Sequence, residues 1–232
     1  MGTDAAPFKK SPALIMLLVP ANAFCCVNCN QELQAAIKSS WQENSLAIAL
    51  PLIALSLIIM ILSWLALRKN NAMLYEPAGM PLLCASLVLG MGLGGFVDGI
   101  VFHQILQWHE MLSNRIPADN LLGKSVNMFW DGIFHLFTML TVLIGIFLIW
   151  KVLKTPQNSS SRYVFGAGLL AGWGIFNVIE GVINHEVFGL HNVREAANEK
   201  EFWNLAFHIL GISLIAASVF LYYKGRKREK II

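Results

Sequence analysis

Five long apolar stretches divide the chain, and each is close to the length that a helix needs to cross a lipid bilayer. About 20 predominantly apolar residues suffice for such a helix. The stretches cover residues 45–67, 80–106, 126–150, 163–190 and 202–223. We therefore predict an all-α fold, an integral membrane bundle of five transmembrane helices.

Composition narrows the function classes. Of the 232 residues, 56% are apolar and 13% are charged, whereas soluble domains carry about 25% charged residues. The net charge of +3 is too small to indicate a polyanionic partner. Composition therefore favours the lipid bilayer as the main partner, and it excludes a disordered chain and a nucleic-acid-binding protein.

The N-terminus has the pattern of an export signal. Lys9 and Lys10 precede a short apolar run at 13–19, and Ala21 and Ala23 form an A-x-A cleavage pattern. We expect a signal peptide at 1–23, followed by an exported segment at 24–44. The alternative is an uncleaved segment that lies in the membrane interface.

Three of the four cysteines stand directly after this signal, at Cys25, Cys26 and Cys29. In an oxidising compartment we expect two of them to form a disulfide. The alternative is a soft-metal site, because thiolates select ions such as copper(I) and zinc.

Basic residues gather at alternate ends of the predicted helices. Arg68 and Lys69 follow the first helix, three basic residues lie within 151–162, and five lie in the tail at 224–232. Cytoplasmic loops carry an excess of Lys and Arg. We therefore expect residues 45–79 to form the first transmembrane helix and a cytoplasmic loop, and residues 224–232 to form a cytoplasmic tail. The N-terminus then lies on the periplasmic or extracellular side of a bacterial inner (plasma) membrane.

All six histidines fall into a repeat within residues 80–223. The pattern Gly-x-Gly-x5-acid-Gly-x3-His-x5-His begins at Gly90 and again at Gly172. A second motif, Phe-Trp-Asp/Asn-x2-Phe-His, begins at Phe129 and again at Phe202. We predict that the last four helices are an internal duplication of a two-helix unit, with both halves in one orientation.

The repeat places the six imidazoles near one side of the membrane. In a continuous α-helix, Asp98 and His109 would stand about 16 Å apart along the axis, and Asp98 and His103 would point about 140° apart around it. We therefore expect one imidazole from each helix to form a ring. The predicted ring is His103, His135, His185 and His208, with Asp98 and Glu180 beneath it, His109 and His191 capping it or forming a second site, and Asp131, Asn204, Trp130 and Trp203 around it.

This set of side chains suits a transition metal. Neutral imidazole binds iron, copper and zinc, and several histidines with carboxylates could hold a dinuclear site. Haem b, with histidines as axial ligands, is the alternative cofactor. We expect redox chemistry or metal handling, with an oxidoreductase as the form an enzyme would take. Proton or ion handling and a structural role in assembly are the other readings.

The motifs resemble a known family. The segment 95–109, the motif Trp130-Asp131-Gly132-x2-His135, and the motif Glu180-Gly181-x3-His185-x5-His191 are similar to a bacterial multipass membrane family called domain of unknown function 2243. The resemblance covers about 80–220 and implies a multipass membrane protein. Some relatives are joined to a membrane domain of the copper-oxidase-assembly type, which implies respiratory metal or redox work beside a larger membrane metalloenzyme or respiratory complex. The family supplies no catalytic residues.

Overall fold

The computed structural model describes residues 30–68, 79–154 and 161–229. The predicted signal peptide and the cysteines Cys25, Cys26 and Cys29 lie outside these described residues. Helices and short connections make up the described part of the chain, with no β-strand in it.

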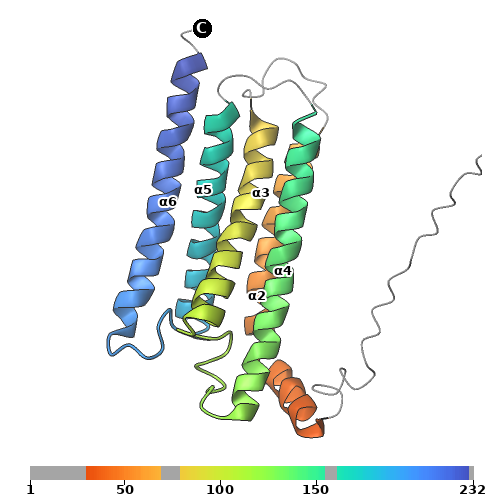
Figure 1. Ribbon diagram of the computed structural model, residues 1–232, viewed down its shortest axis with the longest axis vertical. Helices are drawn as coiled ribbons and strands as arrows, with labels where there is room; N and C mark the ends of the chain where they lie inside the picture. Colours follow the sequence, from red (N-terminus) through yellow and green to blue (C-terminus); the bar gives the residue numbers. More distant parts are fainter. Residues whose placement is uncertain (1–29, 69–78, 155–160, 230–232) are drawn as a thin grey trace, which may run out of the picture.

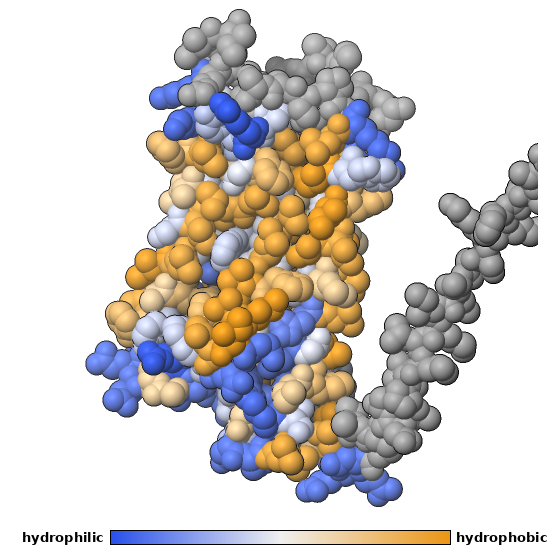
Figure 2. All heavy atoms as spheres, viewed as in Figure 1, coloured by the Kyte–Doolittle hydropathy of each residue, from blue (hydrophilic) through white to orange (hydrophobic). Residues whose placement is uncertain are grey.

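Within the described residues, five helices are long and apolar enough to cross a membrane. They are α2 (Gln31–Leu67), α3 (Met80–Val97) with its continuation η2 (Asp98–Ile105), α4 (Leu121–Val152), α5 (Ser161–Glu180) with its continuation η3 (Gly181–Val187), and α6 (Lys200–Glu229). Figure 2 shows a broad apolar belt around the helices, between two hydrophilic ends. The predicted all-α membrane bundle with five spans is therefore confirmed.

Two helices begin well before their apolar stretches. α2 begins at Gln31 rather than at 45, and α4 begins at Leu121 rather than at 126. Each start is capped by an asparagine: the side chain of Asn30 accepts from the Leu33 backbone N–H at 3.0 Å, and that of Asn120 accepts from Gly123 at 2.8 Å. Hydropathy marks only the part of a helix that lies in lipid, whereas such a cap marks where the helix begins.

The centre of the bundle is the pair α3 and α5. α4 packs on α3 and α6 packs on α5, while α2 lies against α3 and α4. In Figure 1 the π-helical ends of α3 and α5 lie together at the end of the bundle opposite the C-terminus. The connections 106–120 and 188–199 lie at that same end, which we call the loop end.

Glycines bring α3 and α5 into backbone contact. A Cβ atom on Gly90 would strike the backbone of Leu169, and one on Gly172 would strike the backbone of Leu87. In lipid, helices gain little from burying apolar surface against each other, so close packing at small residues holds them together. The α3–α5 contact therefore fixes the spacing of the two helices that carry the acids and histidines.

We predict that Gly172→Ala destabilises the bundle, because the added methyl group meets backbone that cannot rotate away. The expected loss is about 1–3 kcal/mol, the usual cost of overpacking, measured as a lower midpoint of thermal unfolding in detergent. Gly132→Ala is the matched control, since nothing lies within 4 Å of a Cβ at Gly132. Equal shifts in the two variants would contradict this role of the α3–α5 contact.

Candidate metal centre

The acids and the first histidines meet where α3 and α5 change from α- to π-helix. A π-helix bonds residue i to residue i+5, so residues five apart come to share a face. The Oδ2 atom of Asp98 lies 3.2 Å from Nε2 of His103, and Oε1 of Glu180 lies 3.2 Å from Nε2 of His185. The 140° separation expected for a continuous α-helix is therefore wrong for both pairs.

The chain reverses directly after each π-helix. Gln107 has φ 49° and Gly189 has φ 54°, both in the left-handed region. The amide of Trp108 donates to the Phe102 carbonyl at 2.9 Å, and that of Leu190 donates to Asn184 at 2.8 Å. These turns end the helices in the same way at positions 82 apart in the sequence.

The reversal carries His109 and His191 back to the helix ends. The ring centroids of His103 and His109 are 4.3 Å apart, and those of His185 and His191 are 4.8 Å apart. The expected 16 Å between Asp98 and His109 assumed an unbroken helix and does not hold, because η2 ends at Ile105.

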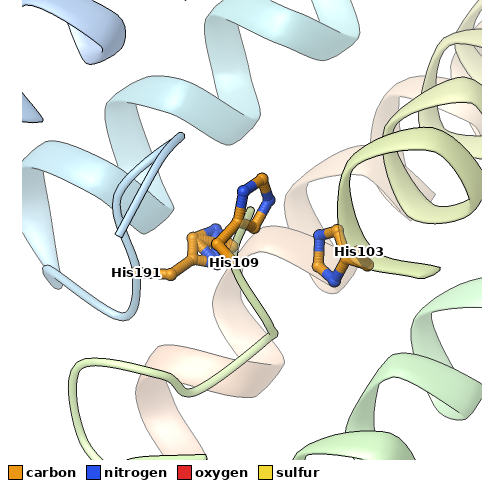
Figure 3. Close-up of side chains that lie close together, drawn as sticks. All are labelled: His103, His109 and His191. Carbon is orange, nitrogen blue, oxygen red and sulfur yellow. The ribbon is translucent and has the colours of Figure 1, made fainter. Parts of the chain in front are cut away.

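Six buried side chains form what we call the histidine cluster: Asp98, His103, His109, Glu180, His185 and His191. None of them is more than 5% exposed. The ring centroids of His109 and His191 are 4.5 Å apart. This contact brings together the two copies of the histidine motif, which begin at Gly90 and Gly172 and which we call the first and second halves. Figure 3 shows His103 on its helix and His109 and His191 on the two loops, with their rings turned toward one another.

The cluster contains two sets of three ligand atoms, and within each set the atoms lie within 4.8 Å of one another. One set is His103, His109 and His191, and the other is Glu180, His185 and His191. His191 belongs to both sets. Such spacing allows a single ion to contact each atom of a set after small side-chain movements.

Three of the four imidazoles are held at their Nδ1 atoms. His109 donates to the Val193 carbonyl at 2.8 Å, and His191 donates to the Glu110 carbonyl at 3.2 Å. Since carbonyl oxygens only accept, Nδ1 carries the proton in both rings. The Nδ1 atom of His103 lies 2.8 Å from Oδ1 of Asp131. This is the way in which metal-binding histidines are usually oriented, with Nε2 left to bind the ion.

Asp131 and Asn204 support the two loops from equivalent positions. Asp131 Oδ1 also accepts from the Met111 amide at 2.9 Å, and Asn204 Oδ1 accepts from the Val193 amide at 3.0 Å. Met111 and Val193 follow the second histidine of their halves by two residues. Each loop is therefore attached to the helix that follows it.

The tryptophans expected around the site lie outside the cluster. The Nε1 atom of Trp130 donates to the Ser40 hydroxyl at 2.9 Å, and its ring stacks on Trp41 of α2 at 5.8 Å. Trp203 packs edge-on against Trp108 at 5.2 Å, with the guanidinium of Arg194 over its ring. Each side chain thus packs against residues outside the cluster.

His135 and His208 do not join the cluster, so the structure does not assemble the predicted four-histidine ring. A Cβ on Gly99 would strike the His135 ring, and a Cβ on Gly181 would strike the His208 ring. The two imidazoles therefore lie against the backbone of η2 and η3. His208 is only partly buried, and its Nε2 atom lies 3.6 Å from Glu186.

Glu110 is a residue that the sequence did not single out. It is buried, forms an ion pair with Lys124, and supplies the carbonyl that holds His191. The second half has Asn192 at the equivalent position, so the repeat contained no signal for it. Glu110 and His109 also line a pocket of about 380 Å³ beside the cluster at the loop end.

Several polar atoms of the cluster are buried without a hydrogen-bond partner among the described residues. They include Oδ1 of Asp98, Nε2 of His109, Oε2 of Glu180 and Nδ1 of His185, while Oδ2 of Asp98 and Nε2 of His185 have only the 3.2 Å contacts given above. Burial lowers the pKa of His109 to about 3 and that of His191 well below its ordinary value. Burial thus favours the neutral form of both rings. Unpaired carboxylate oxygens are costly to bury, and a cation among them would remove this cost.

We predict opposite effects for substitutions at the two reversals. Gln107→Gly should raise the free energy of unfolding by about 1 kcal/mol, because glycine adopts positive φ without a steric penalty. Gly189→Ala should lower it by a similar amount. Thermal unfolding in detergent measures both. Shifts of the same sign would contradict the shared left-handed turn.

Comparisons with known proteins bear on the family and not on the chemistry. No curated protein and no solved structure matches the chain. A family model described as "Predicted membrane protein (DUF2243)" matches residues 85–225. The match includes all six members of the histidine cluster and covers more than half of the chain. The chain therefore belongs to the DUF2243 family of predicted membrane proteins.

Proposed function

We propose that this membrane protein binds a transition metal in the histidine cluster and uses it in redox chemistry or metal handling. One observation carries the proposal. Three buried imidazoles are held at Nδ1 with Nε2 directed into a cluster that also contains two buried carboxylates. Imidazole and carboxylate together suit iron, copper or zinc.

A purely structural hydrogen-bond network is a poorer account of the same residues. Buried polar groups in a structural network are nearly all hydrogen-bonded, since each unpaired one costs stability. Among the described residues, Oδ1 of Asp98 and Nδ1 of His185 have no hydrogen-bond partner, and Oδ2 of Asp98 and Nε2 of His185 each have only one carboxylate–imidazole contact, at 3.2 Å. Buried atoms of this kind, beside the two sets of ligand atoms, favour an ion as the missing partner.

The packing favours an ion over haem b. Neighbouring rings in the cluster have centroids 4.3–4.8 Å apart, and this leaves no flat space for a porphyrin between them. The set Glu180, His185 and His191 has the composition of the two-histidine, one-carboxylate sites that hold non-haem iron(II). Iron is therefore our first choice among the metals.

Charge favours an outward-facing site. The ends of the helices opposite the cluster carry Arg68, Lys151, Lys154, Arg162 and the basic residues of the tail, and positive loops are retained in the cytoplasm. The loop end would then face the periplasm or the exterior of a bacterial inner membrane. A metal at that depth could exchange ions or electrons with a larger membrane metalloenzyme.

Metal analysis together with an optical spectrum of the detergent-purified protein tests the proposal. We expect iron, copper or zinc at one or two ions per chain, without the Soret band of haem. A Soret band would indicate that the cofactor is haem b and not a metal ion held by side chains alone. If no ion binds after reconstitution with iron(II), copper(II) or zinc, the protein is not a metalloprotein of this kind.

Substitutions should separate the observed cluster from the predicted ring. His109→Ala and His191→Ala should each lower the bound metal, because loss of a ligand costs more than loss of an outer partner, which itself costs about 10- to 100-fold in affinity. His135→Ala and His208→Ala are the matched controls and should retain the metal. If these two controls lose the metal and the first pair retains it, the result would instead support the predicted ring of one histidine per helix.

A further inference from the structure

We propose that the histidine cluster holds two metal ions in unequal positions, one in each half of the chain, and that Asp131 makes the first position the tighter one. The proposal rests on the proposed function. The first position consists of Asp98, His103 and His109, and the second consists of Glu180, His185 and His191. Both suit a divalent first-row transition metal.

The free nitrogen of His191 decides how the ligands divide. Its Nδ1 atom donates to the Glu110 carbonyl, so only Nε2 can bind an ion. His191 can therefore be a ligand in only one of the two sets that include it. Nε2 of His191 lies 3.0 Å from Oε1 of Glu180, and Nε2 of His185 lies 3.2 Å from the same oxygen. These contacts assign His191 to the second position.

The remaining ligands occupy equivalent places in the sequence, although their three ligand atoms are less closely grouped than those of the second set. Asp98 Oδ2 lies 3.2 Å from Nε2 of His103, and the ring of His109 is 4.3 Å from that of His103. Asp98, His103 and His109 occupy the same places in the first repeat as Glu180, His185 and His191 in the second. Each half therefore supplies one carboxylate and two imidazoles.

The two positions differ in the partner of the Nδ1 atom of their first histidine, His103 or His185. His103 meets the carboxylate of Asp131 at Nδ1, at 2.8 Å, whereas Nδ1 of His185 has no hydrogen-bond partner among the described residues. Asn204 replaces Asp131 in the second half, and it bonds the loop through Val193 and Asn192. A carboxylate behind a histidine fixes the ring and makes it a stronger ligand. It also adds a negative charge near the ion.

We expect the first ion to bind about 10- to 100-fold more tightly than the second, the usual effect of such an outer partner. Asp131 acts here as a positioning residue, through His103. The second ion, held by the less fixed histidine, is the one that exchanges with the solution.

Titration of the metal-free, full-length protein in detergent with cobalt(II) measures both ions, because each bound cobalt contributes its own visible absorption. Chelator competition gives the affinities. We expect two binding events per chain. Asp98→Asn should remove the tighter event, and Glu180→Gln should remove the weaker one.

Asp131→Asn is the central variant. Asparagine keeps the oxygen that accepts from Met111, as Asn204 does for Val193 in the native second half, so the fold should persist. The tighter event should weaken by about 10- to 100-fold, with a changed cobalt spectrum, while the weaker event stays. Asn204→Asp is the matched control and should leave the tighter event unchanged, because Asn204 bonds the loop and not His103.

A single binding event per chain would overturn the proposal while leaving a metal centre in place. Two events that weaken equally in Asp131→Asn, or do not change in it, would also overturn it. If the wild-type chain binds no cobalt, iron(II), copper(II) or zinc, the proposed function itself fails. The two failures are thus distinguishable.

Discussion

The change from α- to π-helix at Asp98 and Gly181 is the constraint on which the site depends. It brings each acid to the face of the histidine five residues later, at 3.2 Å in both halves. It also ends both helices at the same depth, where left-handed residues turn the chain back. Without this change the second histidine of each half would lie far along the axis from its acid.

The two loops hold each other in place as well as the cluster. A carbonyl of each loop accepts from the histidine of the other: Val193 from His109, and Glu110 from His191. The backbone amide of Asn114 donates to the Leu190 carbonyl, and the backbone amide of Glu195 donates to the Trp108 carbonyl. Because each histidine is oriented by the opposite half, neither half completes the site alone. The tight α3–α5 contact keeps the two ends at the distance that these bonds require.

The spans and the choice of residues were predictable, whereas their grouping was not. Five apolar stretches predicted the five helices, and the motifs predicted the family. The cluster contains Asp98, Glu180 and four of the six repeated histidines, but His135 and His208 lie beside it against glycines. The structure groups the side chains differently from the predicted ring because the ring assumed α-helix throughout, and helical periodicity in a sequence does not show where a π-turn begins. Signal peptide, cysteine pairing and internal duplication stay predictions.

The sequence by itself determined where lipid surrounds the chain and which polar groups must be explained, because apolar length and scarce histidines are local properties. Only the tertiary structure decided which of these groups meet. That outcome depends on hydrogen bonds between the loops 106–120 and 188–199, and on the close packing of His135 against Gly99 and of His208 against Gly181. These are contacts between distant segments, and no local pattern of residues encodes their geometry.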